Sequence, residues 1–414
     1  MIVKPFKAVR PSKEKAEQVA ALPYDVMDSD EAREMVKDNP FSFLHIDKAE
    51  IDLPVEVDHY SDEVYDKAKA NMDKFLAEGT FIRDEKPCFY LYRQIMDDVD
   101  QTGIVGAASI DDYIEDRIKK HEFTRAEKEI DRIRHVDTTN ANTGPIFLTH
   151  PRNAELSDIV AEWKAKDPAY DFTSEDDVRH TVWVIDEAGA VEIIEKAYQE
   201  IPALYIADGH HRSASAVKVG QMRREANPDY TGDEEFNFFL SVIFPSDELA
   251  IMDYNRIVTD LNGLTEEEFL NKVKEKFEVE EYSTGEPYRP EKKHNFGLYL
   301  PGRWFKLTAK PEIIDTDDVL KGLDVSIMAD NVIAPILDIT DQRTSDRIDF
   351  VGGIRGLKEL ERRVATGDFV AAISFFPTDI NDLMKIADSG RVMPPKSTWF
   401  EPKLRSGLFV HELD

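Results

Sequence analysis

The spacing of hydrophobic and polar positions predicts helices and strands along the whole chain of 414 residues. Residues 1–10 alternate like a strand, and "ALPYDVMD" is a loop that leads to a helix over residues 29–37, with Ser29 as its N-cap. Apolar positions at helical spacing predict a second helix that ends at Gly79. "CFYLYRQIM" and "TGIVGAASI" are typical of two strands of a hairpin, and the charged segment 113–139 is expected to be helical.

The second half of the chain is also predicted to contain both strands and helices. "GPIFLTH", "RHTVWVID", "NFFLSVIFPS" and "FVAAISFFP" are expected to be strands, and "NFGLYLPGRWFKLTA" a hairpin that turns at Pro301 and Gly302. Helices are expected over "LTEEEFLNKVKEKF" and "GLKELERRVATG", and over "VSIMADNVIAPIL", broken near Pro335. Segregated hairpins and helices favour an α+β fold with mixed or antiparallel sheets. We predict three regions: 1–110, 111–262 and 263–414.

Composition narrows the class of protein. The chain has 83 Asp and Glu against 52 Lys and Arg, a formal charge of -31, which repels nucleic acid and anionic lipid. No stretch of 18 or more apolar residues and no signal peptide is present, so a membrane protein is not expected. The single cysteine, Cys88, excludes an intramolecular disulfide and a multi-cysteine zinc site. We expect a cytoplasmic enzyme-sized protein; the sequence gives no oligomeric state.

The stretch "ALYIADGHHRSASAVKVG" carries the strongest chemical signal. A buried strand ends at Asp208 and Gly209, and a helix follows directly. The N–H groups at such a helix start have no intrahelical partner, and the helix dipole favours negative charge there. Gly209 allows a sharp turn, Arg212 can bind phosphate with two N–H groups, and the two adjacent histidines can donate hydrogen bonds. The candidate phosphate or nucleotide ligands are Gly209, His210, His211, Arg212 and Ser213.

Two other interpretations of this loop stay open. Asp208 could simply cap the helix, with His210 and His211 on the surface. The adjacent histidines could also hold a metal ion, but neighbours on a tight turn seldom point at one ion, and no further histidine lies within helical reach. We assign no metal ligands.

A basic stripe is the second candidate. On a continuous helix, His121, Arg125, Lys128 and Arg132 would share one face, at spacings of four, three and four. Such a stripe in so acidic a chain favours polyphosphate binding about as much as it favours an exposed helix with ordinary ion pairs. Glu122, on the same segment, is a candidate catalytic carboxylate.

Two more segments combine suitable residue types. "ALPYDV" holds Asp25 in a loop fixed by Pro23, which could also be an ordinary turn. "MPPKSTWFEPKLRSG" places basic and hydroxyl groups near Trp399 and Phe400, an arrangement that would suit a nucleotide; these groups are Lys396, Ser397, Thr398, Lys403 and Arg405. The chain contains no P-loop, no G-x-G-x-x-G after a strand, no G-x-S-x-G and no H-E-x-x-H.

Six ordered motifs give the chain a specific resemblance. They are "LPYDV", "NPFSFLHID", "HEFTRAEKEIDR", "ADGHHR", "IMDYNR" and "MPPKSTWFEPKLRSGL". Together they resemble the family known as domain of unknown function 1015, over essentially the whole chain. The family name implies no function.

The stretch "DGHHR" is also similar to the Asp-Gly-His-x-Arg loop of the ParB/sulfiredoxin-like fold, whose members include free-serine kinases that phosphorylate serine with a nucleotide. Sulfiredoxins use a related loop that contains a cysteine. This chain has no cysteine there, so sulfinic-acid repair is not expected. The resemblance implies a nucleotide-binding core, in agreement with the anion site.

These observations predict a phosphotransferase that uses ATP or ADP with Mg²⁺ on a small hydroxylated metabolite, for example serine. Arg212 and the amides of residues 209–211 would hold phosphates, and Lys128 and Arg132 would clamp the nucleotide. Asp208 or Glu122 would accept the hydroxyl proton or hold Mg²⁺, and His210 would donate to the transferred group. A non-catalytic nucleotide-sensing protein and a phosphate-ester hydrolase stay open as alternatives.

Overall fold

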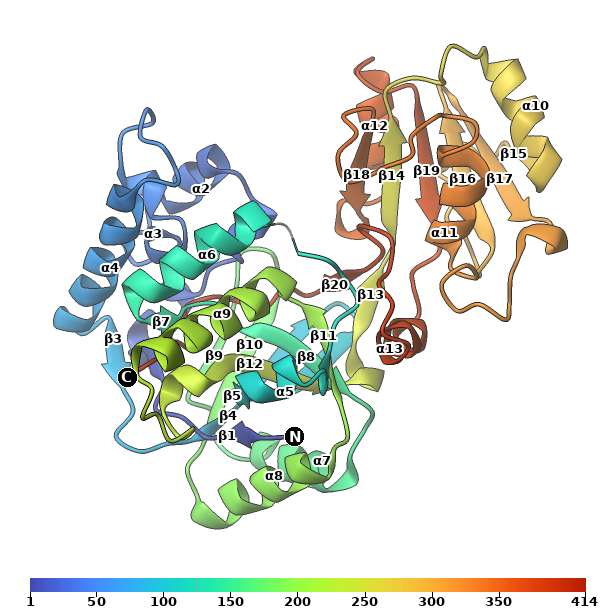
Figure 1. The fold of residues 1–414 in the computed structure, drawn as a ribbon. Coiled ribbons are helices and arrows are strands. Elements are labelled where there is room, and N and C mark those ends of the chain that lie inside the picture. The colour runs from blue at the N-terminus through green and yellow to red at the C-terminus, as the bar shows by residue number, and fades with distance from the viewer. Residues whose placement is uncertain (125) are drawn as a thin grey trace. The chain divides into compact units, whose positions relative to one another are not determined.

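Two β-sheets organise the chain, which we describe from a computed structural model of residues 1–124 and 126–414. They belong to two compact units: Met1–Leu249 with Pro402–Asp414, and Ala250–Glu401. We call them unit 1 and unit 2. They divide the chain at other positions than the three predicted regions, and the chain returns to unit 1 for its last residues. The predicted α+β class is confirmed (Figure 1).

A mixed sheet, nine-stranded in the described residues, is the framework of unit 1. Its strands in spatial order are β6 (Ile118–Lys119), β11 (Leu204–Asp208), β8 (Ile146–His150), β12 (Phe238–Pro245), β5 (Val99–Ser109), β4 (Phe89–Met96), β10 (Arg179–Ile185) and β9 (Tyr170–Thr173), and β1 (Val3–Lys4) also pairs with β5. β4 and β5 form the predicted antiparallel hairpin. Two small ladders join β2 (Val9–Pro11) to β3 (Phe81–Arg83) and β7 (Ala141–Asn142) to β21 (His411–Glu412).

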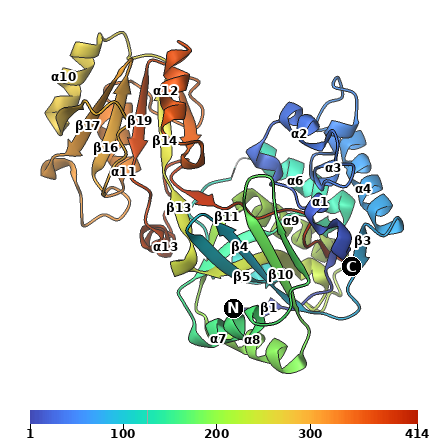
Figure 2. The ribbon, with the colours of Figure 1, turned by 180° about the vertical axis from the view of Figure 1, so that it is seen from behind.

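Helices surround this framework. Those of unit 1 are α1 (Ala16–Val19), α2 (Ser29–Val36), α3 (Leu44–Asp47), α4 (Asp62–Ala77), α5 (Ile110–Ile114), α6 (Ala126–Thr139), α7 (Ala154–Lys164), α8 (Ala188–Glu200) and α9 (His210–Ala226). α6 packs beside α9, and α7 beside α8 at the opposite end of the unit (Figures 1 and 2). None of the helices in the described ranges is both long and apolar enough to cross a membrane.

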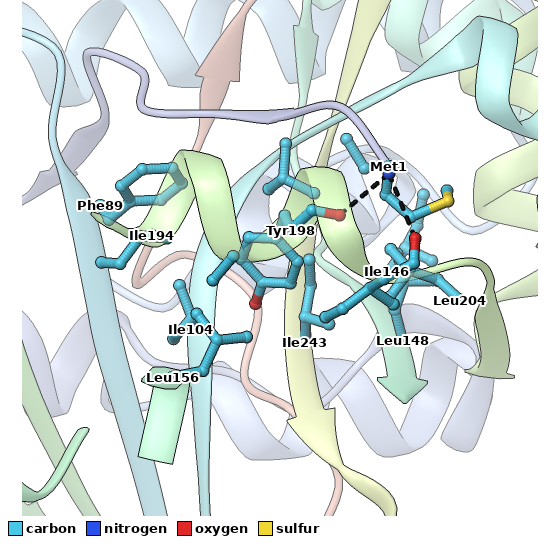
Figure 3. Close-up of a cluster of buried hydrophobic side chains, with 14 of the residues drawn as sticks. Met1, Phe89, Ile104, Ile146, Leu148, Leu156, Ile194, Tyr198, Leu204 and Ile243 are labelled. Atoms are coloured by element: carbon cyan, nitrogen blue, oxygen red, sulfur yellow. Dashed lines mark hydrogen bonds between the residues drawn. The ribbon is translucent and has the colours of Figure 1, made fainter. Parts of the chain in front are cut away.

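The main core of unit 1 lies between the sheet and α7 with α8. Ile104 of β5 and Ile243 of β12 are register partners, so both side chains face the same side of the sheet. Figure 3 shows them with Leu156 and Tyr198, all fully or nearly fully buried. The N-terminal amine of Met1 donates hydrogen bonds to two carbonyl oxygens at the end of α8, which fixes the chain start against this core.

Unit 2 contains a six-stranded antiparallel sheet. Its strands in order are β15 (Phe277–Tyr282), β17 (Arg303–Ala309), β16 (Asn295–Leu300), β19 (Ala371–Phe375), β14 (Tyr254–Val258) and β18 (Ile348–Gly352). The unit also has the ladder of β13 (Ala250–Met252) with β20 (Trp399–Glu401), and helices α10 (Glu266–Lys276), α11 (Asp324–Met328), α12 (Lys358–Ala365) and α13 (Ile380–Asp388). β16 and β17 form the predicted hairpin, and a Thr265–Glu268 capping box starts α10.

Two predicted details are wrong. The N-cap of α2 is Asp28, not Ser29, because the Asp28 carboxylate accepts from the amides of Asp30 and Glu31 and Glu31 returns a capping-box contact. The segment 113–139 is not one helix. Residues 118 and 119 pair in parallel with Leu204 and Tyr205 of β11, and this pairing ends the local helix, so that α6 begins only at Ala126.

Candidate functional site

The turn between β11 and α9 is the centre of the candidate site. β11 lies between β6 and β8, and its register with β8 shifts just before Asp208. Gly209 then takes a left-handed conformation with φ +96°, which an L side chain rarely adopts. The helix α9 starts at His210, and no side chain caps it. A helix start without a side-chain cap is the local feature on which the predicted anion site depends.

Asp208 is held by a residue from the far end of the chain. Nζ of Lys403 donates to Oδ2 of Asp208 at 3.1 Å, and the amide of Gly209 donates to Oδ1 at 2.8 Å. Burial opposes the charged carboxylate, but Lys403 and Arg212 outweigh it and hold the pKa of Asp208 far below its usual range. Asp208 is thus an anionic anchor, and its low basicity makes it a poor acceptor for a hydroxyl proton.

His210 turns into the protein rather than toward a metal ion. Its ring meets the ring of His121 edge to face, with centroids 4.5 Å apart, and its Nε2 accepts from the backbone N–H of His121 at 3.4 Å. Its other nitrogen, Nδ1, lies 3.9 Å from a carboxylate oxygen of Glu122. Burial lowers the pKa of His210 well below its ordinary value, so the ring is neutral and carries its proton on Nδ1, toward Glu122.

Arg212 folds back over the turn. Its Nη1 donates to the carbonyl oxygen of Pro145 at 2.5 Å, and a Cβ added to Gly209 would lie 3.3 Å from its Cζ and Nε. Burial opposes its charge, but Asp25 and Asp208 together raise the pKa of Arg212 above its ordinary value. Its Nε is buried and has no hydrogen-bond partner among the described residues. A buried donor without a partner is costly, so this N–H is suited to an anionic ligand.

A small cavity adjoins the Arg212 side chain. It has a volume of about 20 Å³, room for one water-sized group, and Arg132, Tyr24, Asp47 and His135 also line it. We call it the arginine cavity. Oδ2 of Asp47 is the second buried polar atom here that lacks a partner among the described residues. The cavity thus presents one unused donor and one unused acceptor to a single small polar group.

Arg132 is built rigidly into this wall. It lies 4.1 Å over the Tyr24 ring and pairs with Asp131 at 2.8 Å. Burial opposes its charge, but Asp131, Tyr24 and Asp47 together raise the pKa of Arg132 above its ordinary value. Arg132 therefore lines the same cavity as Arg212, from a buried position on α6.

The predicted stripe on one helix face is wrong at its first member, because His121 precedes α6. Arg125 lies outside the described residues. Lys128 is exposed, and its Nζ lies 3.3 Å from the hydroxyl of Tyr60 on the surface. His121 still joins the site, through the loop after β6, where burial lowers its pKa to about 4.

Other predicted ligands are placed differently. Ser213 is fully buried and its hydroxyl donates to the carbonyl oxygen of His210, so it does not face a ligand, whereas His211 is half-buried. Lys396, Ser397 and Thr398 belong to unit 2, where the Ser397 hydroxyl donates to Pro394. From the same sequence motif, Lys403 belongs to unit 1 and contacts Asp208 at the turn.

No group of three or more His, Cys, Asp or Glu in the described ranges could hold a metal ion. The histidine pair is therefore not a metal site of that kind. Sequence reasoning did not assign Tyr24 and Asp47 to the site as ligands, and it placed Lys403 in a nucleotide-binding segment without linking it to Asp208. All three residues stand in motifs that the sequence analysis singles out, and these motifs were the available signal for them.

The fold and the site define an α+β protein with a buried arginine and an uncapped helix start at one turn. A family model described as "Protein of unknown function (DUF1015)" matches residues 3–326, and the chain belongs to this family. A search of curated proteins finds no significant match.

Solved structures share only distant likeness. A conserved hypothetical protein from Pyrococcus furiosus aligns at 16% identity and TM-score 0.36, over 73% of this chain and 93% of its own. A free serine kinase in complex with AMP aligns at 16% identity and TM-score 0.36, over 73% of this chain and 90% of its own. SbnI from Staphylococcus aureus, with a C-terminal truncation, aligns at 10% identity and TM-score 0.40, over 74% of this chain and 86% of its own. Likeness at this level establishes no shared activity, so the function has to be argued from the site.

Proposed function

We propose that the protein is a nucleotide-dependent phosphotransferase that acts on a small hydroxylated metabolite, with serine as one candidate. One observation carries the proposal: the buried Nε of Arg212 has no partner among the described residues and lies beside the uncapped start of α9. A phosphate oxygen supplies the anionic acceptor that this N–H lacks. The helix amides and dipole favour the same charge.

The arginine cavity sets how a phosphate would enter. Its volume admits one phosphate oxygen and not a whole phosphate, so the remaining oxygens would lie outside, at the start of α9. Because Oδ2 of Asp47 also lacks a partner among the described residues there, the oxygen that enters would be a protonated one, which accepts from Nε of Arg212 and donates to Asp47. Arg132 and Arg212 would neutralise charge from two sides. Positioning and charge neutralisation are the main protein contributions to phosphoryl transfer.

Glu122 is the better proton acceptor of the two predicted carboxylates. Lys403 and Arg212 keep Asp208 ionised and weakly basic, whereas Glu122 is partly exposed and faces Nδ1 of His210. We assign to Glu122 the proton of the substrate hydroxyl. His210 faces that carboxylate with its Nδ1–H at 3.9 Å, and Asp208 with Lys403 fixes the turn.

Mg²⁺ in such reactions is held mainly by substrate phosphates and one or two carboxylates. Because no preformed set of three ligands exists among the described side chains, we assign the ion to the nucleotide. Bound there, it would neutralise charge on the phosphates. The protein itself would bind the phosphates through Arg212 and Arg132 and accept the hydroxyl proton at Glu122.

The test is direct. Purified protein is incubated with ATP or ADP, Mg²⁺ and a panel of hydroxylated metabolites and amino acids, and phosphorus NMR follows the products. A phosphorylated acceptor, lost in Glu122→Gln, supports the proposal. Tight nucleotide binding without any product would select a sensing protein instead, and inorganic phosphate without an acceptor would select a hydrolase. Absence of both binding and turnover would refute all three.

A further inference from the structure

A second and larger cavity lies in unit 1, between α7 and the sheet. It has a volume of about 310 Å³. We call it the α7 cavity. One face of α7 forms its wall, with Leu156 and Val160, and Ile104 and Ile243 from neighbouring strands form its floor. Engineered apolar cavities of about 150 Å³ bind benzene, so this one has room for a molecule of about twice that size.

Polar atoms without partners interrupt this apolar lining. Thr102 is 1% exposed, and its hydroxyl has no hydrogen-bond partner among the described residues. The hydroxyl of Tyr198, which is not among the lining residues, is also buried without a partner in the described ranges and points toward Ile104, Leu156 and Ile243 (Figure 3). Buried hydroxyl groups are normally hydrogen-bonded, so the Thr102 hydroxyl indicates that a polar group of a ligand bonds to it in the cavity.

His150 adds an acceptor to the same lining. Its Nδ1 lies 2.7 Å from the carbonyl oxygen of Pro151, which can only accept, so Nδ1 carries the proton. Burial lowers the pKa of His150, and the ring is therefore neutral at neutral pH. Its Nε2 is then an acceptor, and it receives no hydrogen bond from the described residues.

The charges at this cavity are already compensated. Arg152 pairs with Asp247 at 2.6 Å and with Glu248 at 3.0 Å, and Lys164 lies 4.0 Å from Asp100. A ligand with a net charge would have to break these pairs or be desolvated without a partner. An uncharged ligand meets neither cost.

We infer that the α7 cavity binds an uncharged, largely apolar small molecule that carries one hydrogen-bond donor, of the phenol or indole class. The ring would lie on Ile104, Ile243 and Leu156, and its O–H or N–H would reach Nε2 of His150 or the Thr102 hydroxyl. This site is separate from the proposed phosphotransfer site. β8 joins the two, since Ile146 at its start lines the arginine cavity and His150 at its end lines this one.

Calorimetry with phenol, indole and toluene tests the inference on the full chain. Phenol and indole should bind and raise the Tm, and toluene, which has no donor, should bind about 2- to 12-fold more weakly than phenol, the worth of one neutral hydrogen bond. Val160→Phe fills the cavity and should abolish binding, whereas Ile193→Phe, on the exposed side of α8, should not. Thr102→Val and His150→Phe each remove one of the two acceptors, and at least one of the two variants should bind phenol more weakly without a change in its affinity for toluene.

Each opposite result counts against the inference. No binding of phenol or indole at millimolar concentration would overturn it, as would unchanged binding in a folded Val160→Phe protein. Equal affinity for toluene and phenol would overturn the assigned donor. Arg212→Ala should leave phenol binding unchanged, so a failure of the phosphotransfer proposal is distinguishable from a failure here.

Discussion

Nζ of Lys403 lies 3.1 Å from Oδ2 of Asp208, which joins two residues that are 195 positions apart in the sequence. This contact holds the turn before α9 in place and keeps the Asp208 carboxylate charged. It therefore links the stability of unit 1 to the geometry of the proposed phosphate site.

Removal of this amine should destabilise the protein in a pH-dependent way. Lys403→Met leaves the Asp208 carboxylate with one charged partner fewer, and the free energy of unfolding at pH 7 should fall by about 1–3 kcal/mol. The folded pKa of Asp208 is depressed, so its ionised form stabilises the wild type above about pH 4, and that stability is lost as the pH falls through the folded pKa. In the variant the folded pKa rises toward the unfolded value, so the difference in stability from the wild type is full at pH 7 and shrinks as the pH falls below about 4.

Urea denaturation at pH 7 and at pH 3, below the unfolded pKa of an aspartate, measures this effect. Lys196→Met is the matched control, because Lys196 pairs with Glu192 on an exposed helix face where ion pairs contribute little. Equal losses in the two variants would show that the Lys403 contact has no special role.

Arg212 should dominate nucleotide affinity. Arg212→Ala removes charge-assisted hydrogen bonds, and the Kd for ADP should rise by about 10- to 150-fold, equivalent to about 1.5–3 kcal/mol. Arg223→Ala removes the same charge from the other end of α9, where Arg223 pairs with Asp137, and should leave the Kd nearly unchanged. Calorimetry measures the Kd for ADP of both folded variants. Similar values for the two variants would argue against a phosphate at Arg212.

Gly209 should be required for two separable reasons. Gly209→Ala places a side chain at φ +96°, and its Cβ would lie 3.3 Å from Cζ of Arg212. Gly232→Ala is matched in strain, with φ +97°, but its Cβ would meet nothing within 4 Å. Both should lower the free energy of unfolding by about 1–2 kcal/mol, and only Gly209→Ala should also weaken nucleotide binding. Equal nucleotide affinity in the two variants would show that the close approach of residue 209 to Arg212 is not needed for binding.

His121 should make the protein sensitive to mild acid. Its folded pKa of about 4 lies below its ordinary value, so between about pH 6.5 and pH 4 the unfolded chain binds the proton more readily. Stability therefore falls as the pH falls through this window, by at most about 1.4 kcal/mol per pH unit for one histidine. Chemical denaturation across the window should give a shallower slope for His121→Gln, and an unchanged slope would contradict the assignment.

Sequence patterns predicted the local elements better than the distant contacts. The strand, turn and helix around Asp208 follow from an apolar run, a glycine and a helix start, which are all local signals. The break of the segment 113–139 was not predicted, because residues 118 and 119 pair with β11 some 85 positions later, and this tertiary contact overrides a helical pattern.

The site was predicted in part for the same reason. Asp208, Gly209 and Arg212 lie within one local motif. The partners Lys403, Asp47 and Tyr24 come from segments far away, and no periodicity in the sequence states which of them the fold brings together. The side-chain direction of Ser213 was also missed, because its inward turn depends on where α9 packs.

The most direct measurement is a crystal structure of the protein with ADP. We predict phosphate oxygens within hydrogen-bond distance of Nε of Arg212 and of the amides at the start of α9, with one oxygen in the arginine cavity. Phosphates bound elsewhere in unit 1, with Nε of Arg212 still without a partner, would contradict the proposed function.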